Sequence, residues 1–224
     1  MKRIKLSDRI LPTYTKGEEI FNMVSHIIGG ALGIVAIVLC VIFSAIHKNG
    51  YGIASGIVYG VSLVMLYTMS SIYHGLKANS KAKKVFQIMD HCSIFLLIAG
   101  TYTPFCLCTL REYDAVLGWT IFGIVWGLAI LGITLNSIDI KKYKAFSMIF
   151  YLAMGWCIIF RIDVVYKMLG MTGFLLLLLG GVVYTIGAVI YGLGKKHKWM
   201  HGVFHIACVI ASLLQFLCIL LYVI

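Results

Sequence analysis

Residues 168–193 read MLGMTGFLLLLLGGVVYTIGAVIYGL and contain no Asp, Glu, Lys or Arg. A helix that crosses the hydrocarbon core of a bilayer needs about 20 predominantly apolar residues, and this stretch exceeds that length. The rest of the chain repeats the pattern, with apolar runs separated by short polar connectors. The six other runs are Ile20–Ile46, Tyr51–Leu76, Val85–Leu110, Ala115–Asn136, Ala145–Phe160 and Trp199–Ile224. The sequence therefore predicts an all-α fold, a seven-transmembrane helical bundle.

The composition supports a membrane protein. Of the 224 residues, 61% are hydrophobic and 12% are charged, whereas a soluble domain carries roughly 25% charged residues. So few charges cannot cover a water-facing surface of this size. We therefore expect a single membrane domain over residues 20–224, located in the cell membrane. A basic cytoplasmic segment at residues 1–19 precedes it and lacks the features of a cleaved signal peptide.

The basic residues predict an orientation. The net charge is +11, but the Lys and Arg residues lie in short connectors, which favours topology setting and contact with anionic headgroups over nucleic-acid binding. With seven spans, fifteen of the nineteen Lys and Arg residues fall on the side of the N-terminus. The N-terminus is then cytoplasmic and the C-terminus outside. A six-span model, in which the short run Ala145–Phe160 does not cross, divides the charges fourteen to five, so charge alone does not decide.

Glycines predict close helix contacts, because small residues allow helices to approach closely in lipid. They are frequent, at 23 positions. The glycines expected to face a neighbouring helix are Gly29, Gly30 and Gly33 in the first run and Gly118, Gly123 and Gly127 in the fourth.

Polar residues gather at one predicted depth. Ionisable groups inside spanning helices are costly and tend to be functional. Four runs carry such groups close to their cytoplasmic ends: Asn22, Ser25 and His26; Ser70 and His74; Asp90 and His91; His201 and His205. In a six-span model the last pair would lie about 30 Å from the others, so the shared depth favours seven spans. Because His91 is adjacent to Asp90, it points about 100° away from it and is not a candidate.

The spacing of the histidines predicts a metal site. His201 and His205 are four residues apart and share a helix face. With His74 as a third ligand and water as a fourth, they would form the tetrahedral arrangement of a catalytic zinc. Ser70 lies four residues before His74 on the same face. Asp90 would hold the water on the metal or orient a ligand.

Other interpretations remain open for these residues. Two histidines beside a basic connector are also typical of a solvated membrane interface, and so is His74 taken alone. Asp90 would equally cap its helix or pair with Lys83 or Lys84. His26 would be either a hydrogen-bond donor supporting the ligands or a packing residue.

Four motifs resemble one family in order along the chain. They are Glu18–Gly29 (EEIFNMVSHIIG), Ser70–His74 (SSIYH), Asp90 with the segment Thr101–Phe105 (TYTPF), and His201–His205 (HGVFH). Together they are similar to bacterial hemolysin III-related proteins, which belong with the progestin and adipoQ receptor family. The resemblance covers essentially the whole chain from Glu18 onward.

The resemblance implies a seven-helix fold with a cytoplasmic N-terminus and a zinc ion held by His74, His201 and His205. Asp90 and Ser70 would contact the water on the metal or a ligand. Supporting contacts are expected from His26, Asn22 and Glu19. The family is similar in this pattern to alkaline ceramidases, which implies metal-dependent hydrolysis of a lipid amide.

The sequence is therefore compatible with three functions. The first is a zinc-dependent hydrolase acting on a lipid amide or ester, with Asp90 and Ser70 as catalytic residues. The second is a membrane-active, pore-forming hemolysin. The third is a sensor or regulator of membrane lipids in which zinc is structural. The expected partners are membrane lipids, with a lipid substrate and no nucleic acid, and the oligomeric state stays open.

Overall fold

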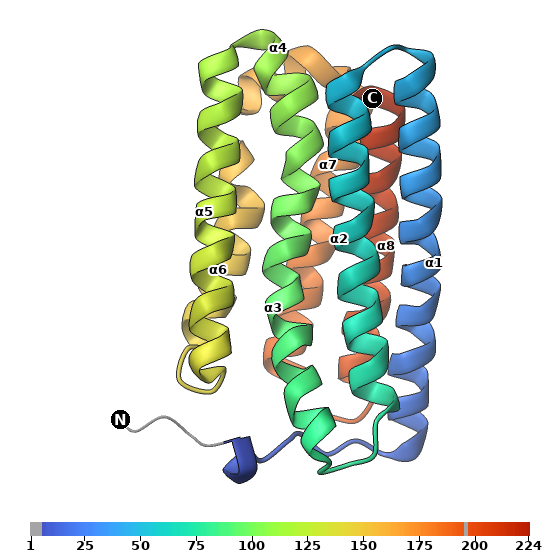
Figure 1. The fold of residues 1–224 in the computed structure, drawn as a ribbon, viewed down its shortest axis with the longest axis vertical. Coiled ribbons are helices and arrows are strands. Elements are labelled where there is room, and N and C mark those ends of the chain that lie inside the picture. Colours follow the sequence, from blue (N-terminus) through green and yellow to red (C-terminus); the bar gives the residue numbers. More distant parts are fainter. Residues whose placement is uncertain (1–5, 195–196) are drawn as a thin grey trace.

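The computed structural model describes residues 6–194 and 197–224, which form a bundle of long helices without a strand (Figure 1). The long helices are α1 (Lys16–Ile46), α2 (Gly50–Gly75), α3 (Lys81–Pro104), α5 (Ala115–Asp139), α6 (Lys144–Trp156), α7 (Ile162–Leu193) and α8 (Met200–Tyr222). The short ones are η1 (Leu6–Asp8), the π-helical η2 (Phe105–Leu110), α4 (Arg111–Tyr113) and η3 (Cys157–Arg161). The predicted all-α class is confirmed.

Side-chain caps set where four of the helices begin. Thr15 and Glu18 form a capping box at the start of α1, and Asn49 accepts a 2.8 Å hydrogen bond from a backbone N–H at the start of α2. Ser80 and Asp114 cap α3 and α5 in the same way. Each cap satisfies N–H groups that have no partner within their own helix. The polar connectors between apolar runs are therefore also the start signals of the helices.

Close helix packing follows the predicted glycines only in part. A Cβ added at Gly33 would lie 3.0 Å from the backbone nitrogen of Val64, so α1 and α2 meet at this point without room for a side chain. Gly118 similarly lies against the backbone of α4. The prediction was wrong for Gly123 and Gly127, where no atom lies within 4 Å. These two positions are on an open face of α5, and spacing alone could not distinguish that face from a packed one.

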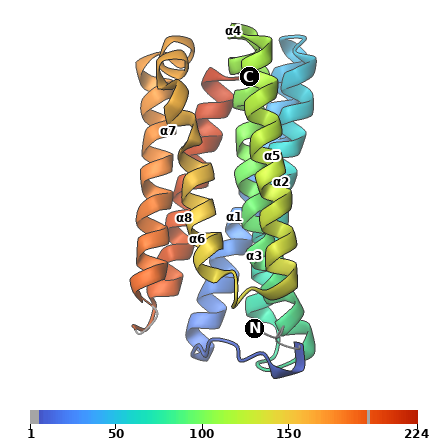
Figure 2. The same ribbon diagram turned by 90° about the vertical axis from the view of Figure 1, so that its left-hand side faces the viewer.

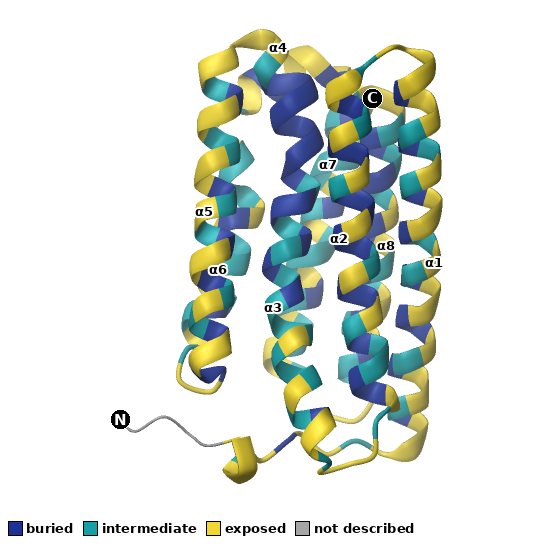
Figure 3. Cartoon of the chain, viewed as in Figure 1, coloured by how far each residue is buried: buried dark blue, intermediate teal, exposed yellow. Residues whose placement is uncertain are grey.

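The outer surface of the bundle is apolar. Large aliphatic side chains lie exposed along the helices, including Ile28 (60% exposed), Ile34 (58%) and Ile130 (62%). Buried residues concentrate on the inner faces, most densely on α3 (Figure 3). Water would not solvate such a surface, whereas the acyl chains of a bilayer would. The chain is therefore a multi-pass membrane protein.

The number of membrane crossings depends on how residues 144–193 are counted. Six helical stretches in the described residues are long and apolar enough to span. The difference from the predicted seven arises at residues 144–193, where α6, η3 and α7 form one helical stretch of 50 residues. Gly170 breaks its helical geometry at φ 66° and ψ −179°. Figure 2 shows α6 and α7 side by side. The chain reverses between them at the end of the bundle where the C-terminus of the chain lies. Seven crossings and a cytoplasmic N-terminus stay predictions.

We expect Gly33→Val to destabilise the bundle, because the added methyl groups would press into the backbone of α2 at Val64. Overpacking of this kind costs about 1–3 kcal/mol. Gly127→Val makes the same change where nothing lies within 4 Å and serves as the control. Thermal unfolding of both variants in one detergent checks the prediction, and equal melting temperatures would contradict the close α1–α2 contact.

Candidate metal centre

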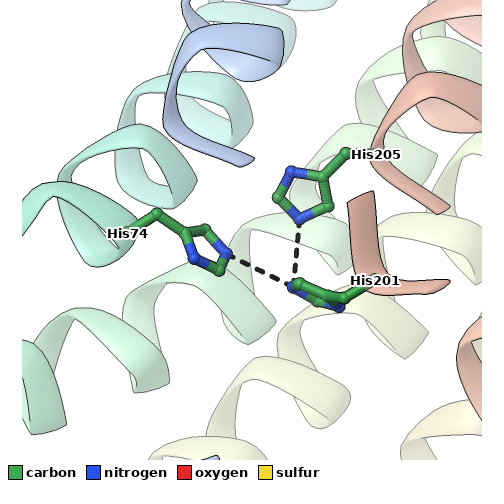
Figure 4. Close-up of side chains that lie close together, drawn as sticks. All are labelled: His74, His201 and His205. Atoms are coloured by element: carbon green, nitrogen blue, oxygen red, sulfur yellow. Dashed lines mark hydrogen bonds between the residues drawn. The ribbon is translucent and has the colours of Figure 1, made fainter. Parts of the chain in front are cut away.

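Three histidine side chains from two helices converge at one end of the bundle (Figure 4). His74 lies in the last turn of α2, and His201 and His205 lie in the first two turns of α8. Nε2 of His201 is 3.3 Å from Nε2 of His74 and 3.1 Å from Nε2 of His205. One ligand atom from each residue lies within 4.8 Å of the other two. The structure thus brings together the three residues predicted as metal ligands.

These distances fit a small tetrahedral ion. With zinc–nitrogen bonds of about 2.0–2.1 Å, two ligands of a tetrahedral zinc lie roughly 3.3 Å apart. Two of the three nitrogen pairs are already at this separation. Three neutral imidazoles that direct ring nitrogens at one point also form a donor set typical of zinc. The residues therefore fit the metal that the sequence predicts.

Two of the three imidazoles are oriented by a hydrogen bond at their other nitrogen. Nδ1 of His74 donates to Oε2 of Glu19 at 2.6 Å, and Nδ1 of His205 donates to the backbone carbonyl of Asn22 at 3.2 Å. Donation from Nδ1 leaves the lone pair of Nε2 directed at the centre of the cluster, as in known metal-binding histidines. Nδ1 of His201 is buried and has no hydrogen-bond partner among the described residues.

Glu19 also pairs with a buried lysine. Its Oε1 accepts a 2.7 Å hydrogen bond from Nζ of Lys83, which lies near the start of α3 and is 2% exposed. The same ammonium donates to the backbone carbonyl of Leu76 at 3.2 Å. Glu19 therefore ties α1 to both α2 and α3. The sequence suggested Glu19 as a supporting residue but did not identify Lys83 as its partner.

Asp90 and Ser70 lie beside the histidines rather than among them. Both line the same cavity as His201 and His205, and Oδ2 of Asp90 is 3.8 Å from Nδ1 of His91. Asp90 is outside the set of atoms that converge on one point. The alternative that it pairs with Lys83 or Lys84 is wrong, since these lysines bond to Glu19 and to the backbone of Ser7. The Ser70 hydroxyl is buried and interacts with the Asp90 side chain.

His26 and Asn22 both contact His205, one through its ring and the other through its backbone. The His26 ring stacks on His205, with ring centres 3.6 Å apart and planes 10° apart. Neither of its nitrogens has a hydrogen-bond partner among the described residues, so the geometry favours the packing role over the donor role. Asn22 contributes its backbone carbonyl, and its buried side-chain amide has no hydrogen-bond partner in the part of the chain that the structure describes.

Sequence reasoning did not single out Tyr14, and it set His91 aside. The Tyr14 ring, just before α1, stacks on His201 with ring centres 5.0 Å apart and planes 19° apart. Burial raises the pKa of the Tyr14 phenol above its ordinary value, with a further contribution from Tyr73. The phenol therefore stays neutral at physiological pH. His91, set aside because of its angle, lines the cavity next to Asp90. A helix angle could place His91 only approximately, and no motif marks Tyr14.

An apolar cavity of about 240 Å³ opens from the cluster into the bundle. Ser70, Asp90, His201 and His205 are among the residues that line it at the end of the cluster. The remaining lining is mostly aliphatic and aromatic and comes largely from α3, η2, α6, η3, α7 and α8, including Leu97, Phe105, Trp156, Phe174 and Leu178. The arrangement places polar and potentially reactive groups at one end of a space suited to hydrocarbon.

Comparison with known proteins places the chain among its relatives. A family model described as haemolysin-III related matches residues 14–216. Hemolysin-3 of Bacillus cereus is 40% identical over 206 residues, which cover 92% of this chain and 92% of that protein. The hemolysin-3 homolog of Bacillus subtilis (strain 168) is 38% identical over 209 residues, covering 93% and 96%. The human monocyte to macrophage differentiation factor is 25% identical over 172 residues, covering 74% and 68%.

The matched region contains every motif that pointed to the family and all three converging histidines. The relatives from the two Bacillus species match over nearly their whole lengths. The more distant human match agrees with the link to the progestin and adipoQ receptor family. The chain therefore belongs to the haemolysin-III-related family of membrane proteins.

Proposed function

We propose that this protein is a zinc-dependent hydrolase that cleaves an amide or ester bond of a membrane lipid. The observation that carries the proposal is the convergence of three imidazole nitrogens at the polar end of an apolar cavity. His74, His201 and His205 would hold the metal. Three protein ligands, with a fourth position left for water or substrate, are typical of catalytic rather than structural zinc.

A bound zinc would supply a Lewis acid that polarises the carbonyl and makes water nucleophilic near neutral pH. The chain's own residues would manage protons and orientation. The Asp90 carboxylate would accept a proton from the attacking water and return it to the departing amine or alcohol. The Ser70 hydroxyl, which interacts with the Asp90 side chain, would donate a hydrogen bond to the substrate's carbonyl oxygen.

The cavity supports a lipid as the substrate. Its lining is largely hydrocarbon, so it would accept an acyl chain and exclude bulk water from the reacting end. Hydrocarbon burial would supply binding energy in proportion to the apolar area covered. The polar atoms at the reacting end then select a head region with a carbonyl. A membrane-embedded amide or ester with at least one long acyl chain satisfies both conditions.

The position of the cluster supports seven crossings. α2 ends and α8 begins at the same end of the bundle, because His74 and His201 meet there. α5 also returns the chain to this end. We infer that residues 144–193 cross the membrane twice on the way to α8. At about 1.5 Å per residue, their helical length is more than twice the hydrocarbon thickness of about 30 Å. The excess of basic connectors at this end supports a cytoplasmic N-terminus.

A membrane-active hemolysin is the second candidate, supported by the name of the Bacillus cereus relative, Hemolysin-3. Lysis of erythrocytes by the purified protein, unchanged in a His205→Ala variant, would favour it over the hydrolase. The third function, a lipid sensor with structural zinc, predicts that zinc is bound but that no lipid is turned over.

We expect the purified protein to carry about one zinc per chain and the variants His74→Ala and His201→Ala to lose it, because two remaining imidazoles hold zinc weakly. His47→Ala, at an exposed position in the connector at the other end of the bundle, is the control and should keep its zinc. Metal analysis after gel filtration provides the measurement. Zinc-free wild-type protein would remove the basis of the proposal.

Asp90→Asn should lower kcat for lipid amide hydrolysis roughly 10²–10⁴-fold, the usual contribution of a general acid–base group. The zinc content should not change, since Asp90 lies outside the ligand cluster. Turnover of a ceramide and of an N-acyl amino acid is measured in detergent, with Asp163→Asn at an exposed position as the control. Full zinc with no turnover of either amide by the wild type would instead favour the sensor.

Alkaline phosphatase fused after Ile224 should be active in a bacterial host, because it folds only outside the cytoplasm and seven crossings place the C-terminus there. The same reporter fused after Lys142 should be inactive, since this connector is predicted to be cytoplasmic. An inactive C-terminal fusion that is present at normal levels in the membrane would contradict the seven-span topology.

A further inference from the structure

The three histidines of the cluster are supported unequally. His74 bonds to a carboxylate and His205 to a backbone carbonyl through Nδ1. The corresponding nitrogen of His201 has no hydrogen-bond partner among the described residues. A metal-binding histidine is ordinarily oriented through its second nitrogen. Among the described residues, the contacts that orient the His201 ring are therefore ring contacts.

The Tyr14 ring contacts His201, the histidine that lacks a hydrogen bond at Nδ1. Its ring lies nearly parallel to the His201 imidazole, with centres 5.0 Å apart. It also approaches His74, with ring centres 5.7 Å apart. Aromatic contacts at such distances favour defined relative orientations of the two rings. The other aromatic neighbours of His201, Tyr191 and Phe204, lie at 5.6 and 5.8 Å and are tilted by 51° and 36°. Among the tyrosine and phenylalanine rings around His201 in the described residues, Tyr14 is the nearest and the most nearly parallel.

The segment that carries Tyr14 is itself fixed to the bundle. It runs beneath the end of the helices from η1 to α1 (Figure 1). At its start, Lys84 of α3 donates a hydrogen bond to the backbone carbonyl of Ser7. At its end, Thr15 and Glu18 form the capping box of α1. Leu11, between these points, is 6% exposed. Anchors on both sides hold the Tyr14 ring against the cluster.

A further contact links this segment to the start of α8. Oε1 of Glu18 accepts a 2.7 Å hydrogen bond from the backbone N–H of Trp199, which immediately precedes α8. Trp199 has a φ of 67°, an uncommon conformation for a bulky residue that requires such outside support. The chain around Tyr14 and the helix that carries His201 are therefore positioned by the same contact.

We propose that Tyr14 is a positioning residue of the metal centre, which holds His201 in its ligating orientation by ring stacking. This inference rests on the proposed function, because it takes the three histidines as metal ligands. The phenol ring, rather than its hydroxyl, provides the support. Loss of the ring leaves His201 free to rotate, so the metal is released faster while its rate of capture changes little.

The test compares Tyr14→Ala with Tyr14→Phe in the full-length protein in detergent. Zinc release is followed with an excess of a chromogenic chelator, and the apparent affinity by competition. We expect Tyr14→Ala to release zinc roughly two- to tenfold faster than the wild type, as the strength of an aromatic pair implies. Tyr14→Phe should restore the wild-type rate within about a factor of two. Tyr113→Ala, at the opposite end of the bundle, is the matched control.

Cobalt substitution gives a readout independent of turnover. The visible spectrum of bound Co²⁺ reports its coordination geometry, so it should change in Tyr14→Ala and be restored in Tyr14→Phe. Wild-type release and spectra in Tyr14→Ala would overturn the role of Tyr14 and leave the zinc site intact. Equal acceleration of capture and release would also overturn it, since that pattern indicates a barrier to entry rather than an orienting contact. Absence of bound zinc in the wild type would defeat both proposals.

Discussion

The contact of α1 with the ends of α2 and α8 is the constraint on which the metal centre depends. α1 provides the carboxylate on His74, the backbone carbonyl on His205 and the imidazole stacked on His205. Its close approach to α2 is possible because Gly33 has no side chain at the contact. In lipid, where the hydrophobic effect does not drive helices together, such close packing and internal hydrogen bonds decide the arrangement. A shift of α1 would therefore disturb two of the three imidazoles together.

Much of the fold was predictable because the bilayer imposes simple rules. Apolar runs of sufficient length must become helices, since lipid offers no partner to the backbone. The shared depth of the polar residues then predicted that His74 of one helix would meet His201 and His205 of another, far away in the sequence. The position of a residue along its span gives its depth in the membrane, and the helical repeat gives the side of the helix on which it lies. Together they were enough to predict which ligands converge.

What the sequence could not predict depends on direction around each helix and on segments outside the spans. Gly123 and Gly127 have the spacing of a packing face, but α5 directs them away from its neighbours. Lys83 pairs with Glu19 on another helix rather than with Asp90, which is nearer in the sequence. Tyr14 belongs to a connecting segment, where no helical repeat predicts the position of a side chain. These contacts arise from tertiary packing, which spacing does not encode.

The charges around the cluster bear on the chemistry it would support. The negative charge of Glu19 is balanced by Lys83 at 2.7 Å, so Glu19 orients His74 without neutralising a nearby cation. Histidine binds a metal as the neutral imidazole and so adds no negative charge to the ion. A dication held there would keep most of its positive charge, in surroundings where few polar groups screen it. Such a centre stabilises an oxygen that becomes negative during attack on a carbonyl, which an acidic ligand set would do less well. The pairing of Glu19 with Lys83 is therefore compatible with the proposed hydrolytic centre.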